Sequence, residues 1–231
     1  RDKDGQRIIK LSDTETSPDI LPNRYRQLAD IIRFYKPECI LESGAWNGGR
    51  AIEMALAAFK YKEKVHYIGF DLFEDATTDT DHVEFNVKPH NTLQAVRNRF
   101  EEFAKHIKDK EDKTFTFELY KGNVRETLDR MLRTEEISDV DFALMGSGNS
   151  WETVEAEYKV LKYVPVVVAD HYFTTDDDEG LPPEKYQGVK HVFDDVPTKK
   201  VDAQETTKDG WTNFDESTAT RKYILPSGDK V

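Results

Sequence analysis

The residues best placed to do chemistry stand where predicted strands end. An apolar segment, residues 39–43, contains Glu42 and runs into a glycine-containing turn over residues 44–49, which opens a helix. Such a turn leaves backbone N–H groups and the positive end of a helix facing a crevice that a nucleotide-like ligand can approach closely. The next strand segment ends in Asp71, whose carboxylate can accept hydrogen bonds from two hydroxyl groups. This pattern predicts a protein that binds a nucleoside-containing cofactor.

Alternating strands and helices are predicted to position these residues. A helix over 23–35 carries Leu28, Ile31 and Ile32 on one face, and strand and helix segments then alternate to residue 169. The predicted strands are 39–43, 65–71, 114–120, 140–145 and 164–169, and the predicted helices are about 49–61, 92–107, 123–133 and 150–162. This order is typical of a parallel sheet with helices on both faces.

The rest of the chain completes the predicted architecture. Two further segments, 199–204 and 220–225, read as strands, and we expect them to form an antiparallel pair that closes the sheet. The fold class predicted is therefore α/β, a Rossmann-like, doubly wound and mainly parallel seven-stranded sheet with a C-terminal antiparallel pair. Its 231 residues suit a single domain over 23–231 behind an N-terminal extension of residues 1–22.

Charge and composition restrict the partners. Asp and Glu outnumber Lys and Arg by 45 to 33, and the basic residues are scattered, which favours a small-molecule partner over nucleic acid. Apolar runs reach only strand length, so neither a membrane partner nor a leader is expected, although Arg1 at the start leaves a removed segment open. The lone Cys39 fits a core position in a reducing compartment and a cytoplasmic location. A homo-oligomer stays open.

Two kinds of α/β protein place a glycine turn after the first strand. Dinucleotide oxidoreductases use the fingerprint G-x-G-x-x-G, which admits a pyrophosphate to the end of the helix. Here Ala45, Trp46 and Asn47 separate Gly44 from the next glycine, and Glu42 would stand close to phosphate charge. A nicotinamide oxidoreductase is therefore disfavoured.

The second kind is the class I S-adenosylmethionine-dependent methyltransferases, which this chain resembles. Their first motif has an acidic residue, one further residue and a glycine-rich turn, and residues 42–48 are similar to it, with Ala45 and Trp46 departing from the usual pattern. The resemblance implies that Asp71 holds the ribose and that Glu42 organises the turn and the methionine end of the cofactor. The cofactor-binding residues that it implies are Glu42, Gly44, Ala45, Asn47, Gly48, Asp71, Leu72, Gly122, Asn123, Val124 and Met145.

The segment 141–154 resembles a narrower group, the small-molecule methyltransferases related to macrolide-sugar O-methyltransferases and the cephalosporin-hydroxylase-like group. These relatives have Asp-Gly-Gly-His-Ser, in which the Asp binds a divalent metal and the His can act as a base. This chain has Gly146 and Asn149 at those two positions. Because an amide cannot accept a proton at neutral pH, Asn149 is expected to orient a substrate rather than to act as a base.

A second element of those relatives, an acidic pair after an apolar strand, is similar to Asp170 and His171. The catalytic candidates are therefore Asn149, Asp170 and His171. Asp170 and His171 are also the metal candidates, although Mg²⁺ prefers oxygen-rich sites, and the alternative is a hydrogen-bonded pair at a strand end. Two long connections, 73–91 and 172–182, could cover a substrate or be plain surface insertions. The first contains His82 and His90, which could replace the missing base if the loop folds over the crevice, and which are otherwise solvated loop residues.

The function that the resemblance implies is S-adenosylmethionine-dependent methyl transfer to a small hydroxylated acceptor, sugar-like or natural-product-like. Gly146 and Asn149 would weaken it. Methyl transfer needs little from a protein beyond alignment, because the sulfonium is already activated. The alternative is a catalytically silent protein that binds S-adenosylmethionine or S-adenosylhomocysteine in a regulatory or scaffolding role.

Overall fold

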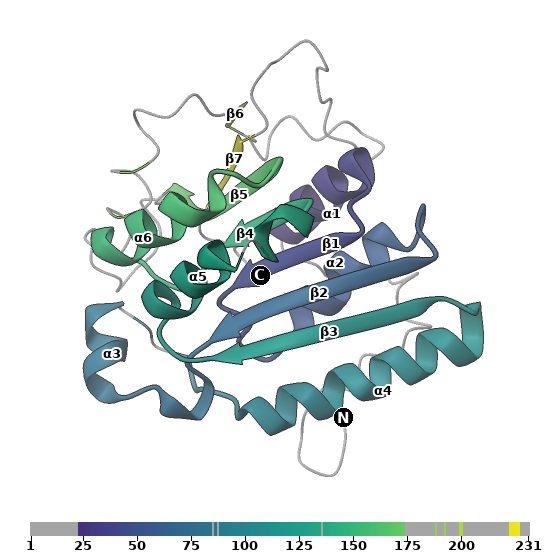
Figure 1. Cartoon of the computed structure of the whole chain (residues 1–231), viewed down its shortest axis with the longest axis horizontal. Helices are drawn as coiled ribbons and strands as arrows, with labels where there is room; N and C mark the ends of the chain where they lie inside the picture. The colour runs from purple at the N-terminus through teal and green to yellow at the C-terminus, as the bar shows by residue number, and fades with distance from the viewer. Residues whose placement is uncertain are drawn as a thin grey trace.

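A computed structural model describes residues 23–84, 86, 88–134, 136–173, 188, 192, 199–200 and 222–226 of the chain (Figure 1). The expected N-terminal extension, residues 1–22, lies outside the described residues. Among the described residues, no helix combines the length and the apolar character that crossing a membrane requires.

The sheet runs in the order β3-β2-β1-β4-β5-β7-β6, and all its strand pairs are parallel (Figure 1). Its strands are β1 Cys39–Ser43, β2 Lys64–Asp71, β3 Thr114–Lys121, β4 Phe142–Met145, β5 Val166–Phe173, β6 Lys199–Lys200 and β7 Lys222–Pro226. The order of the first five strands is that of doubly wound Rossmann-like sheets. The predicted parallel α/β sheet is therefore confirmed.

The predicted antiparallel pair at the C-terminal end is wrong. β7 pairs in parallel with β5 and also in parallel with β6, where Lys199 lies opposite Tyr223. An antiparallel pair can be joined by a short hairpin, whereas a parallel pair needs a crossover of about a dozen residues or more. The chain between Lys200 and Lys222 is long enough for that crossover, and the strand pattern by itself carries no direction.

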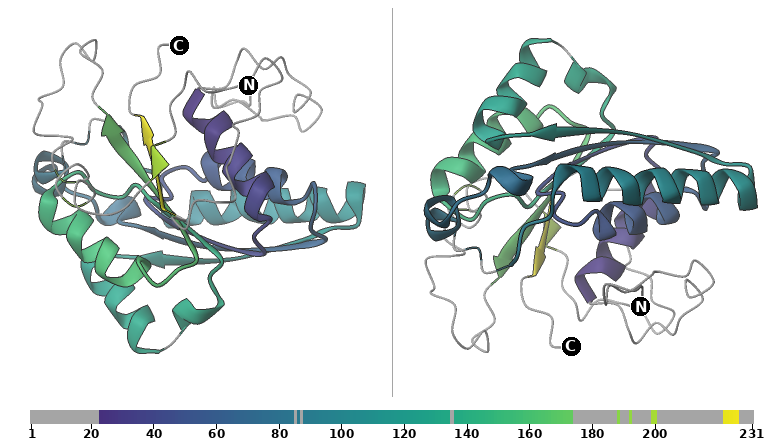
Figure 2. Two further views of the ribbon diagram at one scale, coloured as in Figure 1. Left: turned by 90° about the horizontal axis from the view of Figure 1, so that it is seen from above. Right: turned by 90° about the horizontal axis from the view of Figure 1, so that it is seen from below.

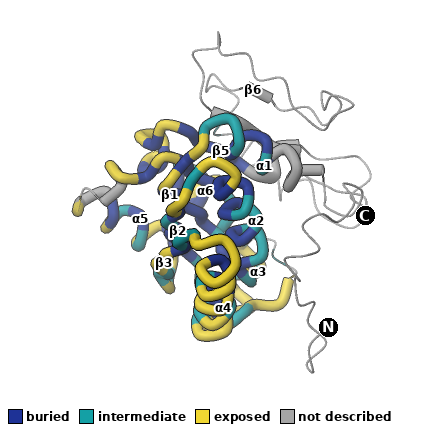
Figure 3. Tube along the Cα trace, turned by 90° about the vertical axis from the view of Figure 1, so that its right-hand side faces the viewer, coloured by how far each residue is buried: buried dark blue, intermediate teal, exposed yellow. Residues whose placement is uncertain are grey.

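Helices cover both faces of the sheet (Figure 2). The helices α1 Asn23–Tyr35, α2 Gly49–Ala58 and α4 Leu93–Glu111 lie on one face, and α5 Val124–Arg133 and α6 Trp151–Leu161 lie on the other. Successive residues of a strand point to opposite faces, so Ile40 packs in the core beneath the first group and Leu41 in the core beneath the second. The outward face of α4 is exposed (Figure 3).

The predicted loop 73–91 contains two short helices, η2 Phe73–Asp75 and α3 Thr78–Val83. A further short helix, η3 Glu136–Asp139, follows α5. In α3 a capping box stabilises the first turn, because the side chains of Thr77 and Thr80 each accept the backbone N–H of the other residue. None of the residues of α3 is buried, so no apolar periodicity marked this helix in the sequence.

Candidate functional site

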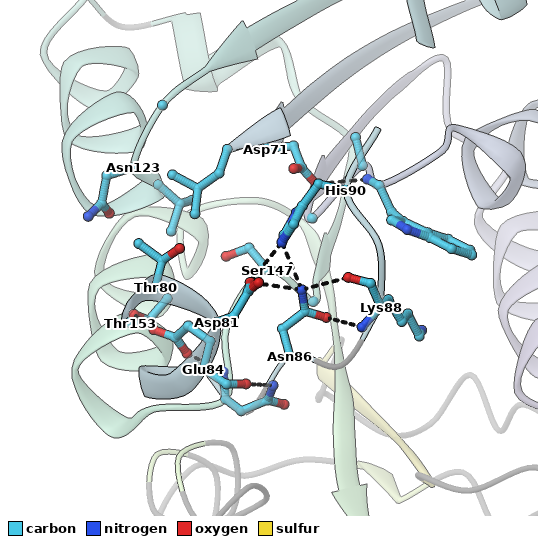
Figure 4. A pocket seen from close by; sticks show the side chains of 18 of the residues that line it. Asp71, Thr80, Asp81, Glu84, Asn86, Lys88, His90, Asn123, Ser147 and Thr153 are labelled. Atoms are coloured by element: carbon cyan, nitrogen blue, oxygen red, sulfur yellow. Dashed lines mark hydrogen bonds and ion pairs between the residues drawn. The ribbon is translucent and has the colours of Figure 1, made fainter. Parts of the chain in front are cut away.

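A cavity of about 590 Å³ opens at the carboxyl ends of the central strands (Figure 4). Gly44 follows β1, Asp71 ends β2, Gly122 follows β3 and Gly146 follows β4, and all four line the cavity. β1 lies between β2 and β4, so the order of the strands reverses there, and open α/β sheets bind ligands outside such a switch point. The segment between β2 and α4 forms the opposite wall.

Most of the predicted cofactor-binding residues line this cavity, and three do not. Those that line it are Gly44, Ala45, Asn47, Asp71, Leu72, Gly122, Asn123 and Val124, together with the catalytic candidate Asn149. Glu42, Gly48 and Met145 are buried and do not line it. Asp170 and His171 lie in β5, but their side chains are outside the described part, so their catalytic and metal roles stay predictions.

The glycines of the turn serve close packing. Gly44 has a φ of 86°, and a Cβ there would lie 2.4 Å from the carbonyl oxygen of Gly146. Because Gly44 has no Cβ, the ends of β1 and β4 can approach each other at the cavity floor. A Cβ on Gly48, at a φ of 76°, would lie 2.5 Å from the ring of Phe100. Gly48 therefore acts through packing against α4 rather than by facing a ligand.

Asp71 fixes the backbone of two turns beside the cavity. Its Oδ2 accepts a hydrogen bond from the N–H of Trp46 at 2.8 Å, and its Oδ1 accepts one from the N–H of Phe73 at 2.7 Å. Trp46 has a φ of 47° and Phe73 a φ of 50°, values that side-chain-bearing residues rarely adopt. A carboxylate has about four acceptor sites. Asp71 can therefore stabilise both turns and still accept hydroxyl groups from a ligand.

Glu42 does not line the cavity, but it binds Arg50, which does. Its side chain is fully buried and pairs with Nε of Arg50, while the hydroxyl of Tyr67 donates to Oε2 at 2.6 Å. Burial raises the pKa of Glu42, and Arg50 and Tyr67 act in the opposite direction. Nη2 of Arg50 in turn donates to the carbonyl oxygen of Gly44 at 3.2 Å. Glu42 thus organises the turn through Arg50.

Gly146 and Asn149 occupy the two positions where the similar methyltransferases have an Asp and a His. A Cβ on Gly146 would lie 3.0 Å from Nη2 of Arg50, so a carboxylate there would face the guanidinium. Nδ2 of Asn149 donates to the carbonyl oxygen of Glu84 at 2.6 Å, and the N–H of Asn149 donates to Oε2 of Glu84 at 2.6 Å. Oε2 also accepts the N–H of Ser150 at 2.8 Å. Asn149 therefore ties α3 to the start of α6.

The cavity also holds a histidine and an acid that the cofactor assignment did not include. Nε2 of His90 lies 2.7 Å from Oδ1 of Asp81, and Nδ2 of Asn86 donates to the same oxygen at 3.0 Å (Figure 4). The short distance to a carboxylate favours the proton on Nε2, which leaves Nδ1 as an acceptor. Of the two histidines in the loop 73–91, His90 lines the cavity and His82 does not. Asp81, the partner of His90, carried no signal in the sequence, because the pairing depends on α3.

A buried acid lies behind the cavity wall. Ser147 lines the cavity, and its hydroxyl donates to Oε1 of Glu157, a residue of α6 that is only 1% exposed. Burial raises the pKa of Glu157 to about 7, with the charge of Glu84 as a smaller contribution in the same direction. Glu157 is therefore more readily protonated in the folded chain than in the unfolded chain.

Glu157 should make stability depend on pH. Its stabilising contribution is complete below the ordinary value of 4.5 and is lost as pH rises towards about 7, since the unfolded chain then ionises first. From this group the free energy of unfolding should fall by about 1.4 kcal/mol per pH unit across that window. Urea unfolding of the wild type and of Glu157→Gln between pH 5 and pH 7 checks this. Parallel pH profiles for the two proteins would contradict it.

The described residues contain no group of three or more His, Cys, Asp and Glu side chains arranged to hold a metal ion. The side chains of Asp170 and His171 lie outside the described part of the chain. The assignment of Asp170 and His171 as metal ligands therefore stays a prediction.

Comparisons with known proteins found similar solved structures. No family model matches the chain, and no curated protein matches it. An O-methyltransferase from Bacillus cereus in complex with SAH has 15% identity and a TM-score of 0.48, over 79% of this chain and 72% of that one. The O-methyltransferase TomG from Streptomyces achromogenes, in complex with SAM, has 19% identity and a TM-score of 0.46, over 73% and 65%. An E. coli tRNA N6-threonylcarbamoyladenosine dehydratase in complex with ATP has 12% identity and a TM-score of 0.39, over 90% and 82%.

The fold and the cavity together define a Rossmann-like α/β protein with a cavity at the switch point of its sheet. The further assignment, to a particular activity, rests on the chemistry of the residues in that cavity.

Proposed function

We propose that this protein transfers a methyl group from S-adenosylmethionine to a small hydroxylated acceptor, sugar-like or natural-product-like. The observation that carries the proposal is the position of Asp71, a carboxylate at the end of β2 that lines the switch-point cavity beside the turn after β1. An acid at this place can accept both hydroxyl groups of a ribose. Gly122, Asn123 and Val124 line the cavity near the end of β3, where they would flank the base.

The charge of the cavity supports S-adenosylmethionine over a dinucleotide as the cofactor. The acidic residues that line it are Glu53, Asp71, Asp79, Asp81 and Glu84, against the basic residues Arg50, Lys88 and Arg125. Arg50 is already paired with Glu42. A pyrophosphate would meet net repulsion in such a site, whereas a ligand with positive charge is favoured. The cofactor supplies a methyl group that its sulfonium has already activated, so the protein's contribution is alignment and removal of a proton.

His90 is the residue that we assign to removal of that proton. Nε2 of His90 faces Oδ1 of Asp81 at 2.7 Å. With the proton on Nε2, Nδ1 is the nitrogen that accepts the proton of the substrate hydroxyl, and the carboxylate of Asp81 stabilises the resulting imidazolium. The segment that carries His90 is attached to the cavity wall, because Nε1 of Trp46 donates to the carbonyl oxygen of Pro89 at 2.9 Å. We place this activity in the cytoplasm, which the single buried thiol of Cys39 supports.

A silent cofactor-binding protein is the second candidate function. The observation that favours it is the use of Asn149 to hold Glu84, which gives this position a structural role in place of a catalytic one. An assay for conversion of S-adenosylmethionine to S-adenosylhomocysteine, run with a panel of polyols and glycosides as methyl acceptors, distinguishes the methyltransferase from the silent binding protein. A silent protein binds the cofactor and yields no product with any of them.

Binding of S-adenosylhomocysteine tests the cofactor assignment directly. Titration calorimetry should show saturable binding of S-adenosylhomocysteine and none of NAD⁺ at the same concentrations, because the pyrophosphate of NAD⁺ meets the carboxylates of the cavity. Adenosine serves as the control for recognition of the nucleoside alone. Tighter binding of NAD⁺ than of S-adenosylhomocysteine would reverse the assignment and make an oxidoreductase the better reading.

A further inference from the structure

Three of the carboxylates in the cavity are already used by the chain itself. They are Asp71, which accepts two backbone N–H groups, Asp81, which is paired with His90, and Glu84, which accepts the N–H groups at the start of α6. A carboxylate that is engaged in this way stabilises local structure whether or not a ligand is present.

Glu53 is different from these three. It is partly buried in the cavity wall and makes no hydrogen bond or ion pair with any described residue. The other remaining acid, Asp79, is exposed on α3. Burial raises the pKa of Glu53 to about 7, and the charge of Arg50 only partly opposes this. A carboxyl group withdrawn from water without a partner costs folding free energy, which is characteristic of a residue retained for binding.

The position of Glu53 on α2 directs it towards the ligand. α2 begins at Gly49, directly after the turn, and Glu53 lies one helical turn further on, on the same face. Side chains of a helix lean towards its N-terminus, so the carboxyl group extends towards the turn and the cavity. Arg50 shares this part of the helix, but its guanidinium is held by Glu42 and by the carbonyl oxygen of Gly44. Glu53 is thus the acid left available to a ligand at this end of the cavity.

We propose that Glu53 binds a positively charged group of the ligand, the primary ammonium of the amino-acid part of S-adenosylmethionine. This assignment rests on the proposed function and adds a binding residue to it. The positive end of α2 would repel a cation by itself. The carboxylate of Glu53, one turn into the helix, reverses that preference locally, so the cavity accepts an ammonium next to a helix N-terminus.

Two ligands that differ in the ammonium test the proposal. S-adenosylhomocysteine carries an amino-acid chain, whereas 5′-methylthioadenosine keeps the adenosine and the thioether and lacks that chain. Glu53→Gln should bind S-adenosylhomocysteine about 10- to 100-fold more weakly than the wild type, and 5′-methylthioadenosine equally well. Glu63→Gln, at an exposed acid outside the cavity, is the matched control and should bind both ligands as the wild type does.

The other outcomes overturn the proposal in distinguishable ways. Equal weakening of both ligands by Glu53→Gln would show a general effect on the cavity, and unchanged affinity for both would remove Glu53 from the site. A wild type that binds neither ligand would overturn the proposed function, and this assignment with it. Unfolding at pH 8 gives a test without ligand, since the variant should be as stable as the wild type or more stable. A less stable variant would show that the carboxylate supports the fold.

Discussion

Replacing Arg50 by methionine should lower the free energy of unfolding by about 3–5 kcal/mol, because it leaves the carboxylate of Glu42 buried without its ionic partner. Tyr67 donates one hydrogen bond to Glu42 and cannot neutralise its charge. The loss should be largest at high pH, since burial raises the pKa of Glu42 and a protonated carboxyl group is less costly to bury. Urea unfolding monitored by circular dichroism measures the effect.

A second substitution separates the buried charge from lost packing. Adding Glu42→Gln to Arg50→Met should recover much of the stability, because a neutral amide can still accept the hydrogen bond from Tyr67. Lys108→Met is the matched control, since it removes a basic residue in the last turn of α4 from an exposed ion pair with Asp112 and should change stability little. An Arg50→Met protein as stable as this control would show that the buried pair contributes nothing to the fold.

Replacing Asp71 by alanine should weaken binding of S-adenosylhomocysteine by about 1.5–3 kcal/mol, the scale of lost hydrogen bonds to a charged group. Two effects act together. The ribose loses its acceptor, and the turns at Trp46 and Phe73 lose the carboxylate that fixes their left-handed backbone. Asp71→Asn should not restore binding, because its amide would place an N–H donor against a backbone N–H. Calorimetry on both variants measures these changes.

The control for Asp71 lies four residues further along the chain. Asp75 pairs with Lys121 at 3.0 Å and does not line the cavity. Asp75→Ala should therefore leave the affinity for S-adenosylhomocysteine unchanged. If Asp71→Ala binds the cofactor as tightly as Asp75→Ala does, Asp71 serves only the backbone turns, and the ribose has to be recognised elsewhere.

Local patterns in the sequence determined the order of helices and strands in this protein. Apolar runs of strand length alternate with amphipathic segments of helix length, and both patterns depend on residues close to one another in the chain. For this reason β1 and α1 have the bounds that the sequence predicts. The polar residue at a strand end is a local feature too, and parallel strands bring their ends to one edge. This is why Gly44, Asp71 and Asn123 line one cavity although they lie far apart in the chain.

The alternation of side chains along a strand also indicates which way Glu42 points. Residues two apart on a strand face the same side of the sheet, so Glu42 lies on the same face as Ile40, towards α2 rather than towards the edge of the sheet. The identity of its partner was not contained in that pattern. Arg50 reaches Glu42 only because the turn between them doubles back through the left-handed residues Gly44 and Gly48.

Only the tertiary structure decided the chemistry of the cavity. Glu84, directly after α3, and Asn149, just before α6, meet only in the folded chain, and residues 65 apart carry no common local pattern. The pairing of His90 with Asp81, and the lack of a partner for Glu53 among the described residues, likewise depend on how segments pack across the sheet edge. Backbone periodicity is fixed by neighbours in the chain. The partner of a polar side chain is fixed by which surfaces pack together, and that is settled only when the whole domain folds.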